Sequence, residues 1–286
     1  MLSDRPAALT GADVAVLEVL ADLVAVQLGR LEADAAVRTR RESAVARHLE
    51  PGGMRMVLQP VVDLVDGRVV ALEALARPST GCPPDRAFAE AAEVGLGVEL
   101  ELAAVRAALA LLPHLPADVD LSVNAGPAAA EDPRLLDLVV AAGAPRVVVE
   151  LTEHDDLADR PRLGTALRRL REAGARIAID DAGAGYAGLR SIVDVAPEVL
   201  KLDIGLVRGL DADPARRSLV RALVALAQDL GAVLVAEGVE TTGELEALRR
   251  LGVCRGQGWL LGVPADPVEL DLGPRRLLAL PVPRRG

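Results

Sequence analysis

The apolar residues of this chain fall into short, continuous runs that alternate with longer amphipathic segments. Such runs occupy residues 56–62, 69–75, 119–123, 147–151, 175–180, 198–203 and 232–237, and a shorter one lies near Cys254. They are too continuous for strands with one solvent-exposed face and are typical of parallel strands covered on both faces. Eight runs over about 230 residues predict an α/β fold, a (β/α)8 TIM-like barrel. An open doubly wound sheet is less consistent, because the sequence lacks its glycine-rich phosphate loop.

The segments between these runs carry helix and turn signals. Asp-Pro or Asp-x-Pro begins segments at Asp132, Asp159 and Asp213, and glycine ends segments at Gly174, Gly231 and Gly252. Aspartate and proline favour a helix N-terminus, and glycine favours a left-handed C-terminal cap. The first two runs are joined only by residues 63–68, where Asp66-Gly67 is a hairpin signal. We therefore expect an antiparallel first strand pair.

One long helix is predicted ahead of the barrel, over residues 12–49. Its apolar residues recur at three- and four-residue spacing, at Val16, Leu20, Leu23, Val24 and Leu31, and Pro51-Gly52-Gly53 ends it. An isolated helix with an apolar stripe requires a partner, either a second subunit or a missing upstream domain. We divide the chain into a helical segment, 1–50, and a barrel, 51–286.

Charge and composition narrow the class of protein. The net charge of −10 argues against binding to duplex nucleic acid or to an anionic membrane, since both require clustered Lys and Arg. No apolar run approaches the length of a membrane span, and the first thirty residues lack a basic start followed by an apolar stretch. Two cysteines in 286 residues do not form a disulfide framework. We expect a soluble cytoplasmic protein.

Polar residues stand where the predicted strands end. In a barrel, active-site residues come from the C-terminal ends of the strands. The residues at these positions are Glu73, Asn124, Glu150, Asp180, Asp181, Lys201, Glu237 and Gln257. Each alone has a structural explanation, such as a turn at Asp180-Asp181 or a cap at Asn124. Their agreement over seven strand ends favours one active site, because an unpaired charge is costly to bury.

The residue types in this set indicate the chemistry. Carboxylates with one amide oxygen, and without clustered His or Cys, suit Mg²⁺ or Mn²⁺ and disfavour zinc. Adjacent Asp180 and Asp181 allow one carboxylate to bridge two metal ions, as in phosphodiester hydrolysis. Lys201 is the only lysine and Asn124 the only asparagine in the chain. In a chain whose other basic residues are arginines, a retained lysine points to a role for a compact ammonium.

The same positions carry a family resemblance. The motifs, in chain order, are Glu73-Ala74-Leu75 followed by Arg77, SVN at 122–124, ELTE at 150–153, DDAGAGYAGL at 180–189, KLD at 201–203, AEGVET at 236–241 and GQGW at 256–259. From about Met54 to about Pro264 the chain resembles the EAL domain. This resemblance implies a barrel enzyme that opens the bacterial second messenger cyclic di-GMP to linear pGpG. It also implies dependence on Mg²⁺ or Mn²⁺, and inhibition by Ca²⁺.

The resemblance further implies a role for each matching position. Glu73, Asn124, Glu150 and Asp180 would hold one metal ion, and Asp180 with Asp181 would reach the second. Lys201 and Glu237 would orient and deprotonate the attacking water, Gln257 would support the site, and Glu153 would tether the loop after strand five. Arg77 would contact a substrate phosphate, while Gln59 and Asp203 would face the nucleotide.

Two departures from the family pattern leave alternatives open. The usual DDFGTG reads DDAGAG, with Ala182 and Ala184, and EALLR reads EALAR, with Ala76. The ligands stay intact, but the loop loses an aromatic ring and a hydroxyl. The leading hypothesis is a cyclic di-GMP phosphodiesterase. A catalytically silent cyclic di-GMP receptor and an enzyme for another phosphodiester are the alternatives. The leading helix resembles the end of a GAF domain, or is a dimerisation helix, and we expect a homodimer.

Overall fold

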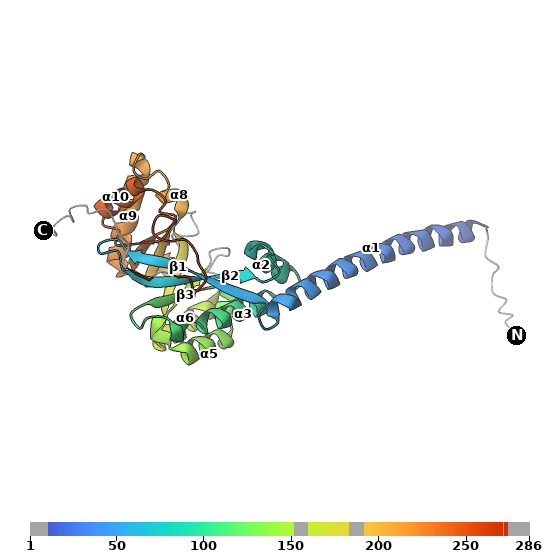
Figure 1. Ribbon diagram of the computed structural model, residues 1–286. Coiled ribbons are helices and arrows are strands. Elements are labelled where there is room, and N and C mark those ends of the chain that lie inside the picture. Colours follow the sequence, from blue (N-terminus) through green and yellow to red (C-terminus); the bar gives the residue numbers. More distant parts are fainter. Residues whose placement is uncertain (1–10, 152–159, 183–191, 271, 274–286) are drawn as a thin grey trace.

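Eight strands close into one barrel in chain order (Figure 1). The computed structural model describes residues 11–151, 160–182, 192–270 and 272–273. The strands are β1 (Met54–Asp63), β2 (Val69–Pro78), β3 (Asp120–Ala125), β4 (Val147–Leu151), β5 (Arg176–Ala182), β6 (Val199–Leu202), β7 (Val233–Ala236) and β8 (Arg255–Gly256). The predicted barrel is confirmed, and each strand overlaps or directly follows its apolar run.

The first strand runs against its neighbours. β1 pairs antiparallel with both β2 and β8, whereas the other neighbouring pairs are parallel. In the β1–β2 turn the Asp63 nitrogen donates to the Arg68 carbonyl at 2.8 Å, and Gly67 has a φ of 80°. A glycine adopts this backbone conformation without steric strain. The antiparallel first pair predicted from Asp66-Gly67 is therefore confirmed.

Helices cover the outside of the barrel. They are α2 (Pro84–Glu93), α3 (Gly97–Leu109), α4 (Pro127–Glu131), α5 (Pro133–Ala142), α6 (Pro161–Glu172), α8 (Ile204–Val207), α9 (Pro214–Leu230) and α10 (Thr242–Leu251), with short 3-10 helices at Leu112–His114 and Ala144–Arg146. The side chains of Asp132 and Asp213 accept hydrogen bonds from first-turn nitrogens of α5 and α9. Gly231 and Gly252 are left-handed caps. The predicted start at Asp159 lies outside the described residues.

Two apolar cores hold the barrel together. The larger lies between the strands and the helices, and the smaller lies among inward-facing side chains of the strands. Val61, Ala71, Val148, Val199 and Val235 belong to the smaller core and are all buried. Branched inward-facing side chains fill a barrel of this kind, so it is a packed interior and not a pore. The polar ends of the strands lie on this rigid base.

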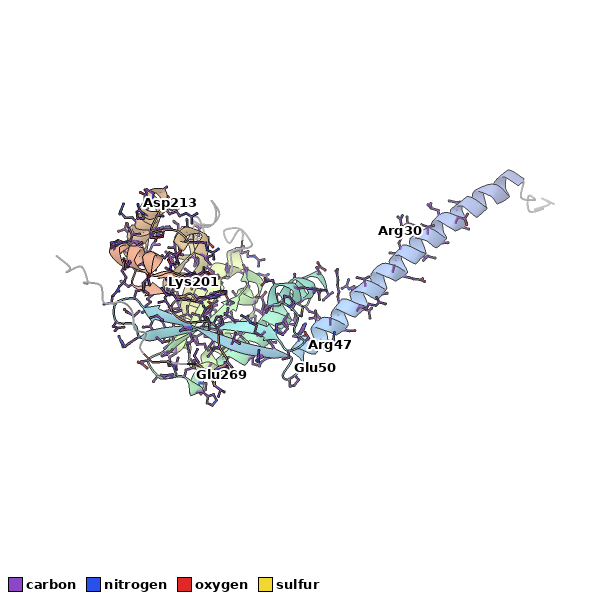
Figure 2. The ribbon with its side chains drawn as sticks, turned by 45° about the horizontal axis from the view of Figure 1, so that its top comes forward. Arg30, Arg47, Glu50, Lys201, Asp213 and Glu269 are labelled. Atoms are coloured by element: carbon purple, nitrogen blue, oxygen red, sulfur yellow. The ribbon has the colours of Figure 1, made fainter. Side chains whose placement is uncertain are left out.

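The long N-terminal helix α1 (Gly11–Leu49) projects away from the barrel (Figure 1). Among its described side chains, the buried ones are Val45 and His48, in the last turns at the junction with the barrel. In Figure 2, Arg47 and Glu50 mark this junction, and Arg30 lies on the projecting part. Among the described residues, no helix is both long enough and apolar enough to cross a membrane.

Candidate active site

A single buried lysine lies at the centre of the polar strand ends. The Nζ of Lys201, on β6, is 2.7 Å from Glu150 Oε2 of β4 and 2.6 Å from Glu237 Oε1 after β7. The same atom is 3.3 Å from Asp180 Oδ1 and 3.4 Å from Glu73 Oε2. The lysine side chain is only 3% exposed. Four carboxylates from four strands therefore converge on one ammonium.

Amide side chains fix the orientation of Glu73. Its Oε1 accepts from Asn124 Nδ2 at 3.1 Å, and its Oε2 accepts from Gln257 Nε2 at 2.7 Å. The same Gln257 nitrogen donates to Gln59 Oε1 at 2.8 Å, and Gln59 Nε2 donates to the Gly262 carbonyl at 3.1 Å. An ionised carboxylate only accepts hydrogen bonds, so both amides must turn their nitrogen toward Glu73. The oxygen of Asn124 consequently faces away from Glu73.

Burial and the neighbouring charges shift the pKa values of the residues in this cluster. Burial raises the pKa of Glu150 to about 8, with Lys201 opposing the shift and Glu73 and Asp180 adding to it. Burial likewise raises the pKa of Glu237 to about 7, against the opposing effect of Lys201. For Glu73 burial is outweighed by Lys201 and the amide donors, which lower its pKa. Lys201 stays protonated because the four carboxylates raise its pKa despite its burial. One ammonium is too little charge for four carboxylates, which leaves capacity for further cations.

The donor atoms suit hard divalent cations. They are carboxylate oxygens and one amide oxygen, the ligands that Mg²⁺ and Mn²⁺ prefer. Within the described part of the chain, no three His, Cys, Asp or Glu side chains already surround a single metal position. The carboxylates converge on the ammonium instead. The side chain of Asp181, the remaining predicted ligand, lies outside the described set.

Comparison with known proteins agrees with the fold. The EAL domain family model matches residues 42–264. The chain belongs to the EAL domain family. The match begins inside α1, so the division at residue 50 stays a prediction.

Two of the curated relatives are named as cyclic di-GMP phosphodiesterases, one of them as a probable one. The chain is 32% identical to cyclic di-GMP phosphodiesterase PA2567 of Pseudomonas aeruginosa, over 77% of this chain and 40% of that protein. It is 33% identical to the probable cyclic di-GMP phosphodiesterase PdeB of Escherichia coli, over 71% of this chain and 41% of that protein. The chain therefore spans about two fifths of these curated relatives.

A solved relative contains both a metal and the nucleotide. The structure of Klebsiella pneumoniae BlrP1 with manganese and cyclic di-GMP matches with a TM-score of 0.69 and 34% identity, over 76% of this chain and 57% of that one. A calcium complex of the same protein with cyclic di-GMP matches with a TM-score of 0.67. These relatives support binding of divalent metal ions within the EAL domain fold.

The structure gathers most of the predicted site residues around Lys201 and Glu73, and it shows Arg77 and Asp203 in other contacts. Arg77, the next-to-last residue of β2, lines a pocket, and its Nη1 donates to the Ala76 carbonyl at 2.8 Å. Asp203 caps α8, where its Oδ1 accepts from the Gly205 nitrogen at 2.8 Å. Gln59, which the resemblance implied would face the nucleotide, is buried and bonded to Gln257. Glu153 lies outside the described residues.

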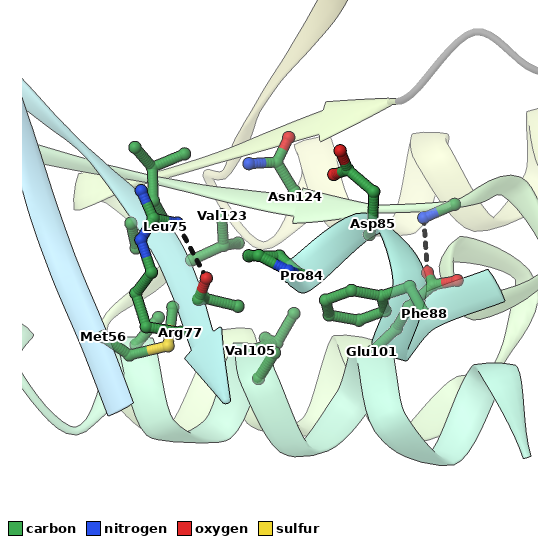
Figure 3. A pocket seen from close by; sticks show the side chains of 16 residues that line it. Met56, Leu75, Arg77, Pro84, Asp85, Phe88, Glu101, Val105, Val123 and Asn124 are labelled. Atoms are coloured by element: carbon green, nitrogen blue, oxygen red, sulfur yellow. Dashed lines mark hydrogen bonds between the residues drawn. The ribbon is translucent and has the colours of Figure 1, made fainter. Parts of the chain in front are cut away.

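A pocket next to the cluster contains a residue that sequence reasoning missed. The pocket has a volume of about 320 Å³ and an apolar lining that includes Val105, Val123 and Phe88. Arg77 lies on one side of it and Glu101, from α3, on the other (Figure 3). Glu101 Oε2 accepts from the Gly126 nitrogen at 2.5 Å, and burial raises its pKa. The one sequence signal is a glutamate between Leu100 and Leu102, which are both buried.

Proposed function

We propose that this EAL domain is a metal-dependent phosphodiesterase that hydrolyses cyclic di-GMP to linear pGpG. The convergence of four carboxylates on the buried Lys201 is the observation that carries the proposal. Burying such a cluster is costly, and clustered carboxylates can hold the divalent metal ions that catalyse phosphodiester hydrolysis. A cytoplasmic location is part of the same proposal, as expected from the composition.

The ligands of this proposal are Glu73, Asn124, Glu150 and Asp180 for one Mg²⁺ or Mn²⁺, and Asp180 with Asp181 for a second. The excess of carboxylates over ammonium supports this assignment. When bound, such ions lower the pKa of water and polarise the phosphodiester. We expect Ca²⁺ to inhibit, because its longer and more flexible coordination acidifies water less.

Two side chains are suited to proton transfer. Glu237, with a pKa of about 7, accepts a proton near neutral pH more effectively than a fully acidic carboxylate. Lys201, 2.6 Å away, holds that carboxylate in place and stabilises negative charge. We therefore assign deprotonation of the attacking water to Glu237, with Lys201 orienting it. Gln257 supports the site by holding Glu73.

Base recognition is assigned to the pocket beside the cluster. A purine ring fits against an apolar lining that includes Phe88. The hydrogen-bonding edge of guanine presents two adjacent N–H donors, which match a carboxylate such as Glu101, whereas adenine presents one donor and one acceptor. Arg77 at the same pocket supplies the cation for a phosphate.

The experiment compares cyclic di-GMP with cyclic di-AMP in Mn²⁺, following linear product by chromatography. We expect turnover of the guanine nucleotide and little turnover of the adenine nucleotide, with the difference reduced in Glu101→Gln. Equal turnover of both nucleotides would remove the assignment of Glu101. If neither nucleotide is hydrolysed, the proposal that the protein is a phosphodiesterase is rejected.

The alternative is a receptor that binds cyclic di-GMP without hydrolysing it. The alanines of DDAGAG favour it, because they remove an aromatic ring and a hydroxyl from the loop after Asp181. Calorimetric titration of cyclic di-GMP in Ca²⁺, beside a turnover assay over a range of Mn²⁺ concentrations, separates the two functions. Tight binding without turnover at any Mn²⁺ concentration would reject the enzyme and favour the receptor. Turnover that needs less Mn²⁺ in an Ala182→Phe, Ala184→Thr variant would locate the defect in the loop.

A further inference from the structure

The projecting part of α1 exposes apolar side chains that the barrel does not cover. Every described side chain from Leu20 to Arg41 is exposed. Among them Leu20, Leu23, Val24, Leu28 and Leu31 are each at least 50% exposed. A helix standing alone in water gains little from propensity, so it depends on burial of such a face.

One line of positions at alternating three- and four-residue spacing runs the length of the helix. It passes through Leu20, Val24, Gln27 and Leu31, and the same seven-residue repeat later reaches Arg38, Arg41, Val45 and His48. We call the stretch from Leu20 to Leu31 the α1 seam. Leu23 and Leu28 flank it and widen its apolar surface.

The far end of the same line packs on the chain's own barrel. Val45 is 1% exposed and His48 is 4% exposed, both at the junction of α1 with the barrel. Between the seam and this junction the line becomes charged. There Arg41 pairs with Glu93 of α2, and Arg38 pairs with Glu42 one turn along, at 2.9 Å. A second helix can follow the seam but must leave this line of positions before Val45 and His48, which the chain's own barrel covers.

We propose that α1 pairs in parallel with α1 of a second copy of this chain along the α1 seam, and that the two helices diverge beyond Arg38 to their own barrels. Gln27 fits a symmetric pair, because an amide both donates and accepts and can bond its equivalent across a two-fold axis. At their present exposure, burying the five apolar side chains on both copies removes on the order of 1,000 Å² from solvent, the size at which specific interfaces begin.

A matched pair of variants tests the seam. Val24 lies in the seam and Val26 on the opposite side of the helix, yet both are 54% exposed. The mass of the full chain is measured by sedimentation equilibrium over a range of concentrations. We expect a dimer for the parent and for Val26→Glu, and at least a tenfold higher dissociation constant for Val24→Glu. A monomeric parent, or equal weakening by both variants, would overturn the proposal.

Cysteine crosslinking tests the direction of the helices. Leu31→Cys places a thiol at the end of the seam and Val24→Cys places one near its middle. In a parallel pair both positions meet their equivalents, so both variants form a disulfide-linked dimer on mild oxidation, unlike the parent with Cys82 and Cys254. Crosslinking of Val24→Cys alone indicates antiparallel helices and would overturn the proposal, and so would crosslinking of neither.

Discussion

Removing the charge of Lys201 should destabilise the metal-free protein severely. In Lys201→Met the side chain keeps its approximate length but loses the ammonium that lies 2.6 to 3.4 Å from four carboxylates. Breaking a buried ion pair by removing one partner costs about 3–5 kcal/mol, because the other charge stays buried without compensation. For a chain of this size such a loss lowers the melting temperature by about 10 °C.

The assay is urea denaturation at pH 7.5 in the presence of a chelator. Arg176→Met is the matched control, since Arg176 pairs with Asp120 at 2.6 Å but is 30% exposed. A solvent-reachable pair of this kind contributes at most about 1 kcal/mol. A Lys201→Met protein within about 1 kcal/mol of the parent would refute the view that this ammonium neutralises the carboxylate cluster.

Three further predictions follow from the site. The chelated protein should melt at a lower temperature at pH 9 than at pH 6. Folding raises the pKa of Glu150 to about 8 and that of Glu237 to about 7, so the folded state binds more protons than the unfolded state and its stability falls as the pH rises. A flat or rising melting temperature would contradict this. The Lys201→Arg variant should still fold but lose orders of magnitude in turnover, because a planar guanidinium does not replace a compact ammonium. Retained activity would indicate that Lys201 has only a structural role. Gly258→Ala should destabilise the protein far more than Gly231→Ala. A Cβ at position 258 would lie 2.2 Å from a backbone nitrogen, whereas one at position 231 would meet open space. Equal melting temperatures of the two variants would disprove this.

The strand ends were predictable because two simple constraints act on them. Continuous apolar runs identify parallel strands, and a charged residue at the end of such a run is tolerated only where other groups compensate it. Glu73, Glu150 and Lys201 satisfy both conditions, so their convergence follows from the barrel topology. The antiparallel pairing of β1 with β2 was equally predictable from the sequence, since Gly67 permits the tight turn.

Other features depend on contacts between distant segments and leave no local pattern. Gln59 and Gln257 are 198 residues apart, and only the closure of β8 onto β1 brings their amides together. Glu101 belongs to a covering helix, so strand-end reasoning does not reach it. Asp203 was assigned to the nucleotide by resemblance, yet the following backbone uses its carboxylate as a helix cap. Short polar side chains serve caps and ligands equally well, and sequence alone does not distinguish the two.

The most direct test of the phosphodiesterase is the fate of cyclic di-GMP itself. Purified protein is incubated with cyclic di-GMP and Mn²⁺, and the nucleotides are separated by chromatography beside reactions with a chelator and with Glu73→Ala. We predict conversion to pGpG by the parent in Mn²⁺ and by neither control, because Glu73 has no substitute carboxylate on its strand. Unconverted cyclic di-GMP in the parent reaction, or near-normal turnover by Glu73→Ala, would contradict the account.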